Sequence, residues 1–221
     1  MSKKIILIAG PTASGKSKLA IVIAKKINGE IINADSMQVY KEFKILSSRP
    51  TIQDLKKAKH HLYGFLSLKK HFSTGAWLKL VKKQIKLSLQ NKKIPILVGG
   101  TGLYFDAVTK GMTKIPNIDF KFRNKIRDLQ KKLGQKKFYQ KLLKLDPLVQ
   151  GKIQPFDTQR SIRAYEVKKF TKKSIFDWYK LTKSDFKGFE IFKIYLDIPR
   201  EQLLKNVAKR TDQMFKFNCI D

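Results

Sequence analysis

Short apolar runs alternate with amphipathic segments over the first half of the chain. The runs Ile5–Ala9, Glu30–Asn33, His61–Phe65 and Ile94–Val98 each have the length of one strand. Residues 74–90 have a helical period instead, with one apolar face: Trp77, Leu80, Val81, Ile85 and Leu89. Strands that alternate with helices are typical of the α/β class, in which helices cover a parallel sheet.

The pattern changes after about residue 112, where apolar residues recur only at helical spacing. One helical run contains Phe122, Ile126, Leu129 and Leu133, and a second contains Phe138, Leu142 and Leu143. A third helix is predicted to begin after Asp157 as its N-cap and to continue to about Phe170. Strand character returns at Ile191–Ile198, and Pro199 then begins another helix. We therefore predict an α/β core at 1–111 and 188–221, interrupted by a basic all-helical insertion domain at 112–187.

A glycine-rich motif follows the first predicted strand directly. Its residues, in the pattern G-x-x-x-x-G-K-S, are Gly10, Pro11, Thr12, Ala13, Ser14, Gly15, Lys16 and Ser17. A strand that turns into a helix through such a loop aims backbone N–H groups at one point, which suits a chain of phosphates. Lys16 is expected to contact the phosphates and the Ser17 hydroxyl to be a ligand of Mg²⁺. The motif predicts a fold like that of the P-loop NTPases; the alternative is a glycine turn that only joins strand to helix.

The chain carries 48 Lys and Arg residues against 17 Asp and Glu, a formal net charge of +31 over 221 residues. Such an excess indicates a polyanionic partner, above all nucleic acid. A coding bias toward lysine is the alternative, because the charge is spread along the whole chain. The single Cys219 excludes a disulfide framework and fits a reducing compartment, so a cytoplasmic location is expected. No run approaches the roughly 18 apolar residues of a membrane span, so we expect no membrane association.

Asp35 follows the predicted strand Glu30–Asn33. Ligands of open α/β sheets bind at the carboxyl ends of the strands, so Asp35 is expected near the phosphate loop. There its carboxylate could take a proton from an attacking nucleophile. The alternative is that Asp35 is only the N-cap of a following helix.

A second glycine cluster, Gly99-Gly100-Thr101, follows the strand Ile94–Val98. Its backbone N–H groups and the Thr101 hydroxyl could approach a second set of phosphate oxygens, so the site is suited to hold a diphosphate from two sides. A P-loop ATPase commonly has an acidic residue at such a position, and its absence argues against coupled ATP hydrolysis. The alternative is a tight turn packed against the sheet.

Four segments together resemble the tRNA dimethylallyltransferases, also called tRNA isopentenyltransferases. In chain order they are GPTASGKS, INADSMQVY, LVGGTGLYFDAV and DTQRSIRAYEV. The resemblance covers nearly the whole chain. It implies an enzyme, a prenyl transferase, that moves the dimethylallyl group of dimethylallyl diphosphate to the exocyclic amino group of adenosine at position 37 of a tRNA and releases diphosphate. The implied partners are the tRNA anticodon stem-loop and the allylic diphosphate, the implied cofactor is Mg²⁺, and a monomer is expected.

The resemblance also assigns roles to single residues. Asp35 would be the base, Lys16 and Arg210 would stabilise the diphosphate, and Thr101 would contact the leaving group or the adenine. Residues 10–17 would bind the donor. The residues that would bind tRNA are Asp35, Ser36, Met37, Gln38, Thr101, Arg123, Gln159, Arg160, Ser161, Ile162 and Arg163. From the sequence alone, Arg210 could equally be an ordinary arginine on the surface of a helix.

The chain departs from the family pattern at its C-terminal end. Family members usually continue with further basic helical sequence, whereas residues 214–221 resemble only the beginning of that segment, so we expect a shortened C-terminus. Two other functions stay open: a phosphotransferase of the nucleotide-kinase type, which would also use the phosphate loop, and a tRNA-binding remnant with impaired catalysis, which the short C-terminus suggests.

Overall fold

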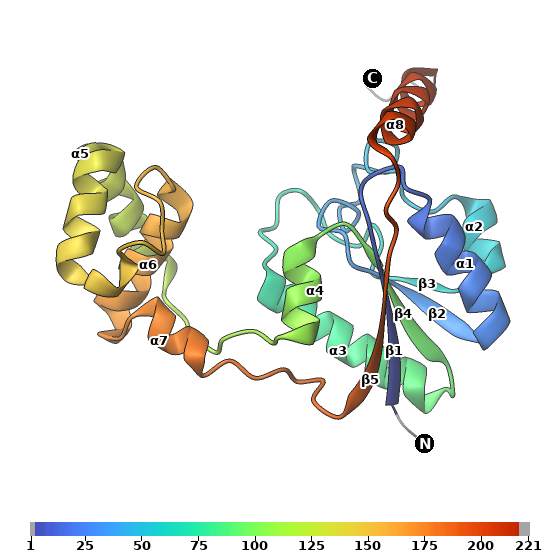
Figure 1. The fold of residues 1–221 in the computed structure, drawn as a ribbon, viewed down its shortest axis with the longest axis horizontal. Coiled ribbons are helices and arrows are strands. Elements are labelled where there is room, and N and C mark those ends of the chain that lie inside the picture. The colour runs from blue at the N-terminus through green and yellow to red at the C-terminus, as the bar shows by residue number, and fades with distance from the viewer. Residues whose placement is uncertain (1–2, 217–221) are drawn as a thin grey trace. The chain divides into compact units, whose positions relative to one another are not determined.

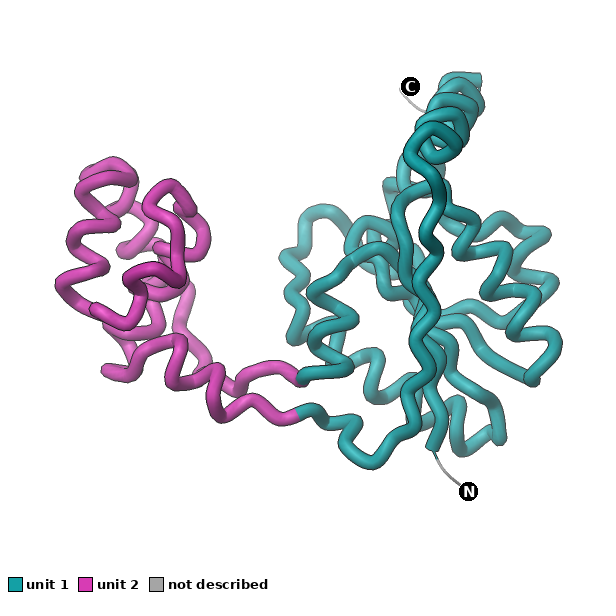
Figure 2. Tube along the Cα trace, viewed as in Figure 1, with its two compact units in different colours: residues 1–110, 184–221 teal, residues 111–183 magenta. Residues whose placement is uncertain are grey.

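The computed structural model describes residues 3–216, which fold as two compact units. The α/β unit comprises residues 1–110 and 184–221, and the helical unit comprises residues 111–183 (Figure 2). The helical unit thus begins at residue 111, where the prediction was 112, and ends at residue 183, where the prediction was 187. Cys219 and most of the family-like C-terminal segment lie outside the described residues.

In the α/β unit, the described strands form one parallel sheet of five strands in the order β3-β2-β4-β1-β5 (Figure 1). The strands are β1 (Lys3–Ala9), β2 (Gly29–Asn33), β3 (His60–His61), β4 (Ile94–Gly99) and β5 (Phe189–Tyr195). The central β1 pairs with both β4 and β5, and its last residue, Ala9, lies opposite Gly99 and Tyr195. The carboxyl ends of the three strands therefore meet at one edge, as the α/β prediction required.

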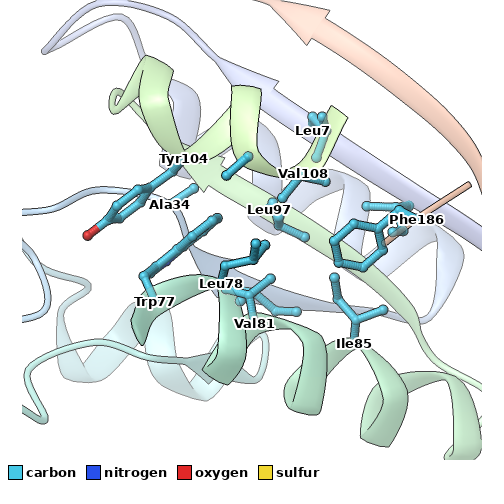
Figure 3. Close-up of a cluster of buried hydrophobic side chains, with 13 residues drawn as sticks. Leu7, Ala34, Trp77, Leu78, Val81, Ile85, Leu97, Tyr104, Val108 and Phe186 are labelled. Atoms are coloured by element: carbon cyan, nitrogen blue, oxygen red, sulfur yellow. The ribbon is translucent and has the colours of Figure 1, made fainter. Parts of the chain in front are cut away.

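Helices cover both faces of this sheet. The helices of the α/β unit are α1 (Lys16–Ile27), α2 (Ile52–Lys57), α3 (Thr74–Gln90), α4 (Gly102–Thr109) and α8 (Arg200–Lys216), of which α8 lies beyond the strand ends and not on a face. The side chains of α1 pack on one face with Ile8 and Ile96. Those of α3 and α4 pack on the other face, where the buried Trp77 stacks on Tyr104 with ring centroids 4.0 Å apart (Figure 3). This apolar packing fixes the strand ends that carry the loops.

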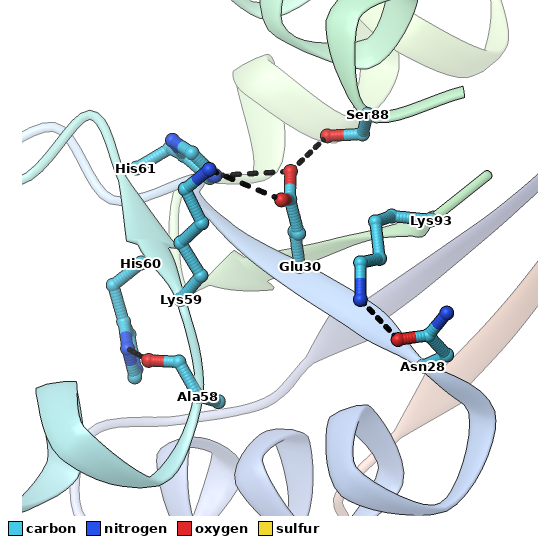
Figure 4. Close-up of polar contacts among 8 residues, drawn as sticks. All are labelled: Asn28, Glu30, Ala58, Lys59, His60, His61, Ser88 and Lys93. Atoms are coloured by element: carbon cyan, nitrogen blue, oxygen red, sulfur yellow. Dashed lines mark hydrogen bonds and ion pairs between the residues drawn. The ribbon is translucent and has the colours of Figure 1, made fainter. Parts of the chain in front are cut away.

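A buried carboxylate lies near the start of β2, at the opposite end of the strand from Asn33. Glu30 is 3% exposed. Its Oε2 accepts hydrogen bonds from Ser88 at 2.7 Å and His61 at 3.1 Å, and Lys59 lies 3.5 Å from Oε1 (Figure 4). Burial works against the charged form of Glu30, but these partners outweigh it and lower its pKa. The cluster ties β2, β3 and α3 together and belongs to the fold.

The helical unit contains α5 (Phe120–Leu145), the short 3₁₀ helix η1 (Pro147–Val149), α6 (Thr158–Thr171) and α7 (Ile175–Lys180). The two helical runs predicted from the sequence form one helix, α5, which is interrupted at Gly134 by non-helical angles (φ 70°, ψ 164°). Asp157 is the N-cap of α6, as predicted, and its side chain accepts from the Arg160 N–H. Phe138, Leu142 and Tyr165 form part of this unit's own apolar core.

Several elements differ from the sequence prediction. The predicted strand His61–Phe65 is only His60–His61, because Leu62 and Gly64 have positive φ values (64° and 55°) that end an extended strand. No helix begins directly after Asp35, so its interpretation as a helix N-cap is wrong. The helices α2, α4 and α7, each of eight residues or fewer, were not predicted.

Candidate functional site

The phosphate loop lies between β1 and α1, where the sequence places it. Gly15, the N-cap of α1, has φ 89°, a value that suits glycine, and no side chain caps this helix. Ala13 also has a positive φ (61°). The first turn of α1 contains no acidic residue, so its orphan N–H groups and the positive end of the helix dipole can receive an anion.

Lys16 lies over this loop. Its ammonium donates to the Pro11 carbonyl and lies 3.5 Å from Ser14 Oγ. Burial lowers the pKa of Lys16 below its usual value, Asp35 acts in the opposite direction, and Arg210 lowers the pKa further. Lys16, Asp35 and Arg210 are therefore close enough to interact electrostatically, although they come from α1, the β2 end and α8.

Asp35 is held by the turn that follows β2. Its backbone N–H donates to Asn33 Oδ1 (2.9 Å), and Asn33 Nδ2 donates back to the Asp35 carbonyl (2.9 Å). Asp35 Oδ1 accepts from the N–H groups of Met37 (2.8 Å) and Gln38 (3.4 Å). One carboxylate oxygen is therefore committed to the turn, while Oδ2 has no hydrogen bond within the described residues. The capping role considered for Asp35 exists, but in a turn, and it occupies only half of the carboxylate.

The second glycine cluster lies directly against Asp35. A Cβ atom on Gly99 would lie 2.0 Å from the Ala34 carbonyl oxygen and 2.8 Å from the Asp35 nitrogen, so only glycine fits there. At Gly100 the corresponding Cβ position is 3.8 Å from Asp35 Oδ2 and 3.7 Å from the Gly10 carbonyl oxygen. The free carboxylate oxygen, the phosphate loop and the second glycine cluster thus meet at one place.

Thr101 links the second glycine cluster to the turn that carries Asp35. Its Oγ1 accepts from the Ser36 N–H at 2.9 Å and lies 3.3 Å from the Ser36 hydroxyl. Because Ser36 follows Asp35, Thr101 helps to fix the segment that carries the carboxylate. The Gln38 amide donates to the carbonyls of Ser47 (2.8 Å) and Ser48 (3.2 Å), whereas Met37 is half exposed. Of residues 36–38, Met37 presents the most accessible side chain.

Helix α8 lies beyond the carboxyl ends of the strands, next to the phosphate loop (Figure 1). Asn206 Nδ2 donates to the Ala13 carbonyl at 3.2 Å. Arg210, one helical turn further on, is partly buried; burial lowers its pKa, and Asp35 partly offsets this effect. Arg210 is therefore partly buried and close enough to Asp35 for their charges to interact.

The residues present suit Mg²⁺ held mainly by a ligand. Within residues 3–216 no group of three or more His, Cys, Asp or Glu side chains could hold a metal ion. Mg²⁺ often has only one or two protein ligands and takes the rest from phosphates and water. Ser17 is exposed in the first turn of α1 and offers one hydroxyl, which fits this pattern.

In the helical unit, the predicted tRNA-binding residues divide into exposed and buried ones. Gln159 and Arg160 are exposed, and Arg160 Nη1 lies 2.8 Å from Asp157 Oδ2. Arg123 and Arg163 are partly exposed, and both contact Glu166. Ser161 and Ile162 are instead buried, at 0% and 9% exposure. The prediction that these two side chains reach an RNA is therefore corrected: they face the core because α6 packs on α5.

Three residues that the sequence analysis did not assign contribute to this arrangement. Asn33 is buried and closes the Asp35 turn. A polar residue that ends an apolar strand is a signal that could have identified it. Glu166 lies inside the quoted segment DTQRSIRAYEV, on the apolar side of α6, which is an equally visible signal. Asn206 has no such signal, because only the tertiary structure brings α8 to the loop.

Comparison with known proteins gives a consistent family. Residues 38–221 match the family model described as IPP transferase. The chain is 58% identical over 217 residues to a tRNA dimethylallyltransferase of Pelagibacter ubique (strain HTCC1062), covering 98% of this chain and 69% of that protein. It is 46% identical over 220 residues to a tRNA dimethylallyltransferase of Rickettsia massiliae (strain Mtu5), covering 99% and 61%.

Solved structures agree. A eukaryotic dimethylallyltransferase acting on tRNA matches with a TM-score of 0.82 and 30% identity, over 99% of this chain and 54% of that one. The full-length tRNA isopentenylpyrophosphate transferase of Bacillus halodurans matches with a TM-score of 0.62 and 32% identity, over 97% and 66%. The chain thus spans between 54% and 69% of the length of these four relatives.

Proposed function

Since this chain belongs to the IPP transferase family, we propose that it transfers the dimethylallyl group of dimethylallyl diphosphate to the exocyclic amino group of adenosine at position 37 of a tRNA. One observation carries the proposal. Asp35 has one oxygen fixed by backbone N–H groups, and its other oxygen faces the junction of the two glycine loops. A base beside an anion-binding loop is the arrangement that such a transfer needs.

The reaction balances with these groups. The adenosine amino nitrogen attacks the first carbon of the allylic group and forms a C–N bond, while the C–O bond to diphosphate breaks. The proton leaves the nitrogen for Asp35 Oδ2, and the bonding electron pair leaves with the diphosphate. Negative charge grows on this leaving group, and the N–H groups at the start of α1, together with Lys16 and Arg210, are positioned to stabilise it.

Mg²⁺ is part of the proposal. Ser17 and the diphosphate oxygens would hold it, and when bound it would neutralise charge on the leaving group. Thr101, tied to Ser36, keeps the carboxylate segment beside the loop. Arg123, Gln159, Arg160 and Arg163 belong to the unit that we propose to bind the anticodon stem-loop.

The proposal is tested with unmodified tRNA, dimethylallyl diphosphate and Mg²⁺, followed by mass analysis of the nucleosides. We expect dimethylallyl adenosine and free diphosphate, with no ATP turnover. Asp35→Asn keeps an oxygen for the Met37 N–H but removes the base, so transfer should fall roughly 10²–10⁴-fold with little change in tRNA affinity. An equal loss of transfer and of tRNA binding in this variant would refute the role of Asp35 as the base. If the unaltered chain binds tRNA but transfers no dimethylallyl group, the proposed enzymatic activity is refuted.

RNA binding has a separate test in salt. Phosphate contacts predict that the logarithm of the association constant for tRNA falls steeply with the logarithm of salt concentration. Flat behaviour would instead favour coding bias as the source of the +31 charge. We further propose that the chain acts as a monomer in the cytoplasm; light scattering of the chain with and without tRNA tests the stoichiometry.

Residues 3–216 contain no helix long and apolar enough to cross a membrane.

A further inference from the structure

A buried acid lies beneath the arginines of the helical unit. Glu166, in α6, is 2% exposed. Its Oε2 is 3.3 Å from Arg123 Nε and 3.4 Å from Arg163 Nη1. One carboxylate oxygen therefore joins two guanidinium groups that come from different helices, α5 and α6, and that are 40 positions apart in the sequence.

This arrangement costs more than a surface ion pair. A carboxylate removed from water is strongly unfavourable unless it is paired and hydrogen-bonded, which the two arginines accomplish. The arginine side chains are still 38% and 36% exposed. Since a guanidinium has five N–H donors and each contact to Glu166 uses one, both arginines keep donors for an external anion. The three residues together carry a net charge of +1.

The surroundings suit an RNA loop. Arg160 is 77% exposed at its side chain. Tyr179 is 51% exposed and packs edge-to-face on Phe176, with ring centroids 5.9 Å apart. Burial raises the pKa of Tyr179, while Arg163 and Arg160 lower it, which means that this ring lies near both arginines. Exposed aromatic rings among arginines are typical of surfaces that bind unpaired nucleotides.

We propose that Glu166 is a positioning residue for RNA recognition: it holds Arg123 and Arg163 in a fixed relation so that their remaining N–H groups meet RNA phosphates or base edges together. The proposal rests on the proposed function and names one device by which the helical unit would recognise its substrate. Glu166 itself touches no RNA. Its effect comes from pre-ordering two long side chains before binding, which removes part of the entropy cost of ordering them.

Glu166→Gln tests this role because two explanations predict opposite signs. The variant loses one negative charge, so the net charge of the chain rises by one and charge alone predicts tighter tRNA binding. Loss of arginine positioning predicts weaker binding, by roughly tenfold, since charge-assisted hydrogen bonds are lost. The matched control is Asp128→Asn, an exposed residue of α5 that gives the same change in charge. Weaker binding of the Glu166 variant alone supports the proposal; equal or tighter binding of both variants overturns it.

A second variant avoids the buried position. Arg123→Lys keeps the net charge, but lysine has a methylene group where arginine has the Nε–H that contacts Glu166. We therefore expect tRNA affinity to fall several-fold. The melting temperature should change too little to explain this loss of affinity. In an Arg123→Ala, Arg163→Ala background, Glu166→Gln should no longer weaken tRNA binding, because no arginine is left for Glu166 to position. An unchanged affinity of Arg123→Lys, or a full Glu166→Gln effect in the double-alanine background, would overturn the proposal.

Failure of this inference can be separated from failure of the proposed function. If the unaltered chain neither binds nor modifies tRNA, the proposed function fails. If it binds and modifies tRNA but Glu166→Gln behaves like Asp128→Asn, only the positioning role fails. Donor affinity, measured as the KM for dimethylallyl diphosphate, should be the same in all of these variants, because the donor loops belong to the α/β unit.

Discussion

The α/β unit holds its candidate groups mainly through the backbone, whereas the helical unit holds its groups through side-chain ion pairs. In the first, glycine contacts, positive φ values and N–H groups of a turn place the phosphate loop and Asp35. In the second, Glu166 links two arginines. A site built from backbone contacts tolerates no added side-chain atom where two backbone segments touch, but salt screens its interactions little. An ion-pair site tolerates changes of shape better and responds strongly to charge.

The strongest test of the backbone site is Gly99→Ala. The added methyl group would overlap the Ala34 carbonyl and press on the Asp35 nitrogen. We expect transfer to fall more than roughly a hundredfold, because the base is displaced, and stability to fall by about 1–3 kcal/mol. Gly102→Ala is the control, since a Cβ there meets nothing within 4 Å. Similar activity of the two variants in the tRNA assay would contradict backbone positioning.

Arg210→Ala tests the side-chain component of the α/β site. The guanidinium is partly buried near Asp35, so its loss should reduce transfer roughly tenfold to a hundredfold by weakening stabilisation of the leaving diphosphate. Steady-state kinetics with varied donor measure the effect. Lys209→Ala removes an equal charge from an exposed neighbour and should change little. If both variants lose activity equally, only the general charge of α8 matters.

A smaller effect is expected of Asn206→Ala. The variant loses the hydrogen bond to the Ala13 carbonyl, which supports the loop at a positive-φ residue. We expect the KM for dimethylallyl diphosphate to rise about three- to tenfold, with kcat less affected. Thr211→Ala, at an exposed position of the same helix, serves as the comparison. A change confined to tRNA affinity would mean that α8 acts on the acceptor and not on the loop.

The smallest effect concerns acid pH and stability. Burial lowers the pKa of His61 despite the neighbouring Glu30, so below pH 6.5 the unfolded chain binds a proton that the folded α/β unit resists. Stability should therefore fall as pH falls from 6.5, and fall further near pH 4.5, because the pKa of Glu30 is also lowered. Urea unfolding of the Trp178→Phe variant measures this dependence. The variant keeps Trp77 as its one tryptophan, so the fluorescence reports on the α/β unit.

The matched variant for the pH test is His61→Gln in the same Trp178→Phe background. It removes the titrating ring, so the loss of stability between pH 6.5 and 5 should be smaller than in the parent. The helical unit contains no histidine and should not share this dependence. An identical pH profile in both proteins would show that His61 does not cause the effect.

Sequence by itself determined the elements and chemistry that depend on local pattern. Apolar runs predicted β1, β2 and β4, helical spacing predicted α3 at about residues 74–90, and the G-x-x-x-x-G-K-S pattern predicted the loop. Positive φ values at Leu62 and Gly64 shortened β3; Gly64 is a visible turn signal, whereas Leu62 has none in the residue pattern.

Only the tertiary structure decided which distant groups meet. The Gly99 contact with Ala34, the hydrogen bond of Asn206 to Ala13 and the sharing of Glu166 by two arginines join segments dozens to nearly two hundred positions apart. Such contacts depend on how whole elements pack, not on the preferences of neighbouring residues. For the same reason the sequence marked Ser161 and Ile162 as binding residues, whereas packing of α6 on α5 buries them.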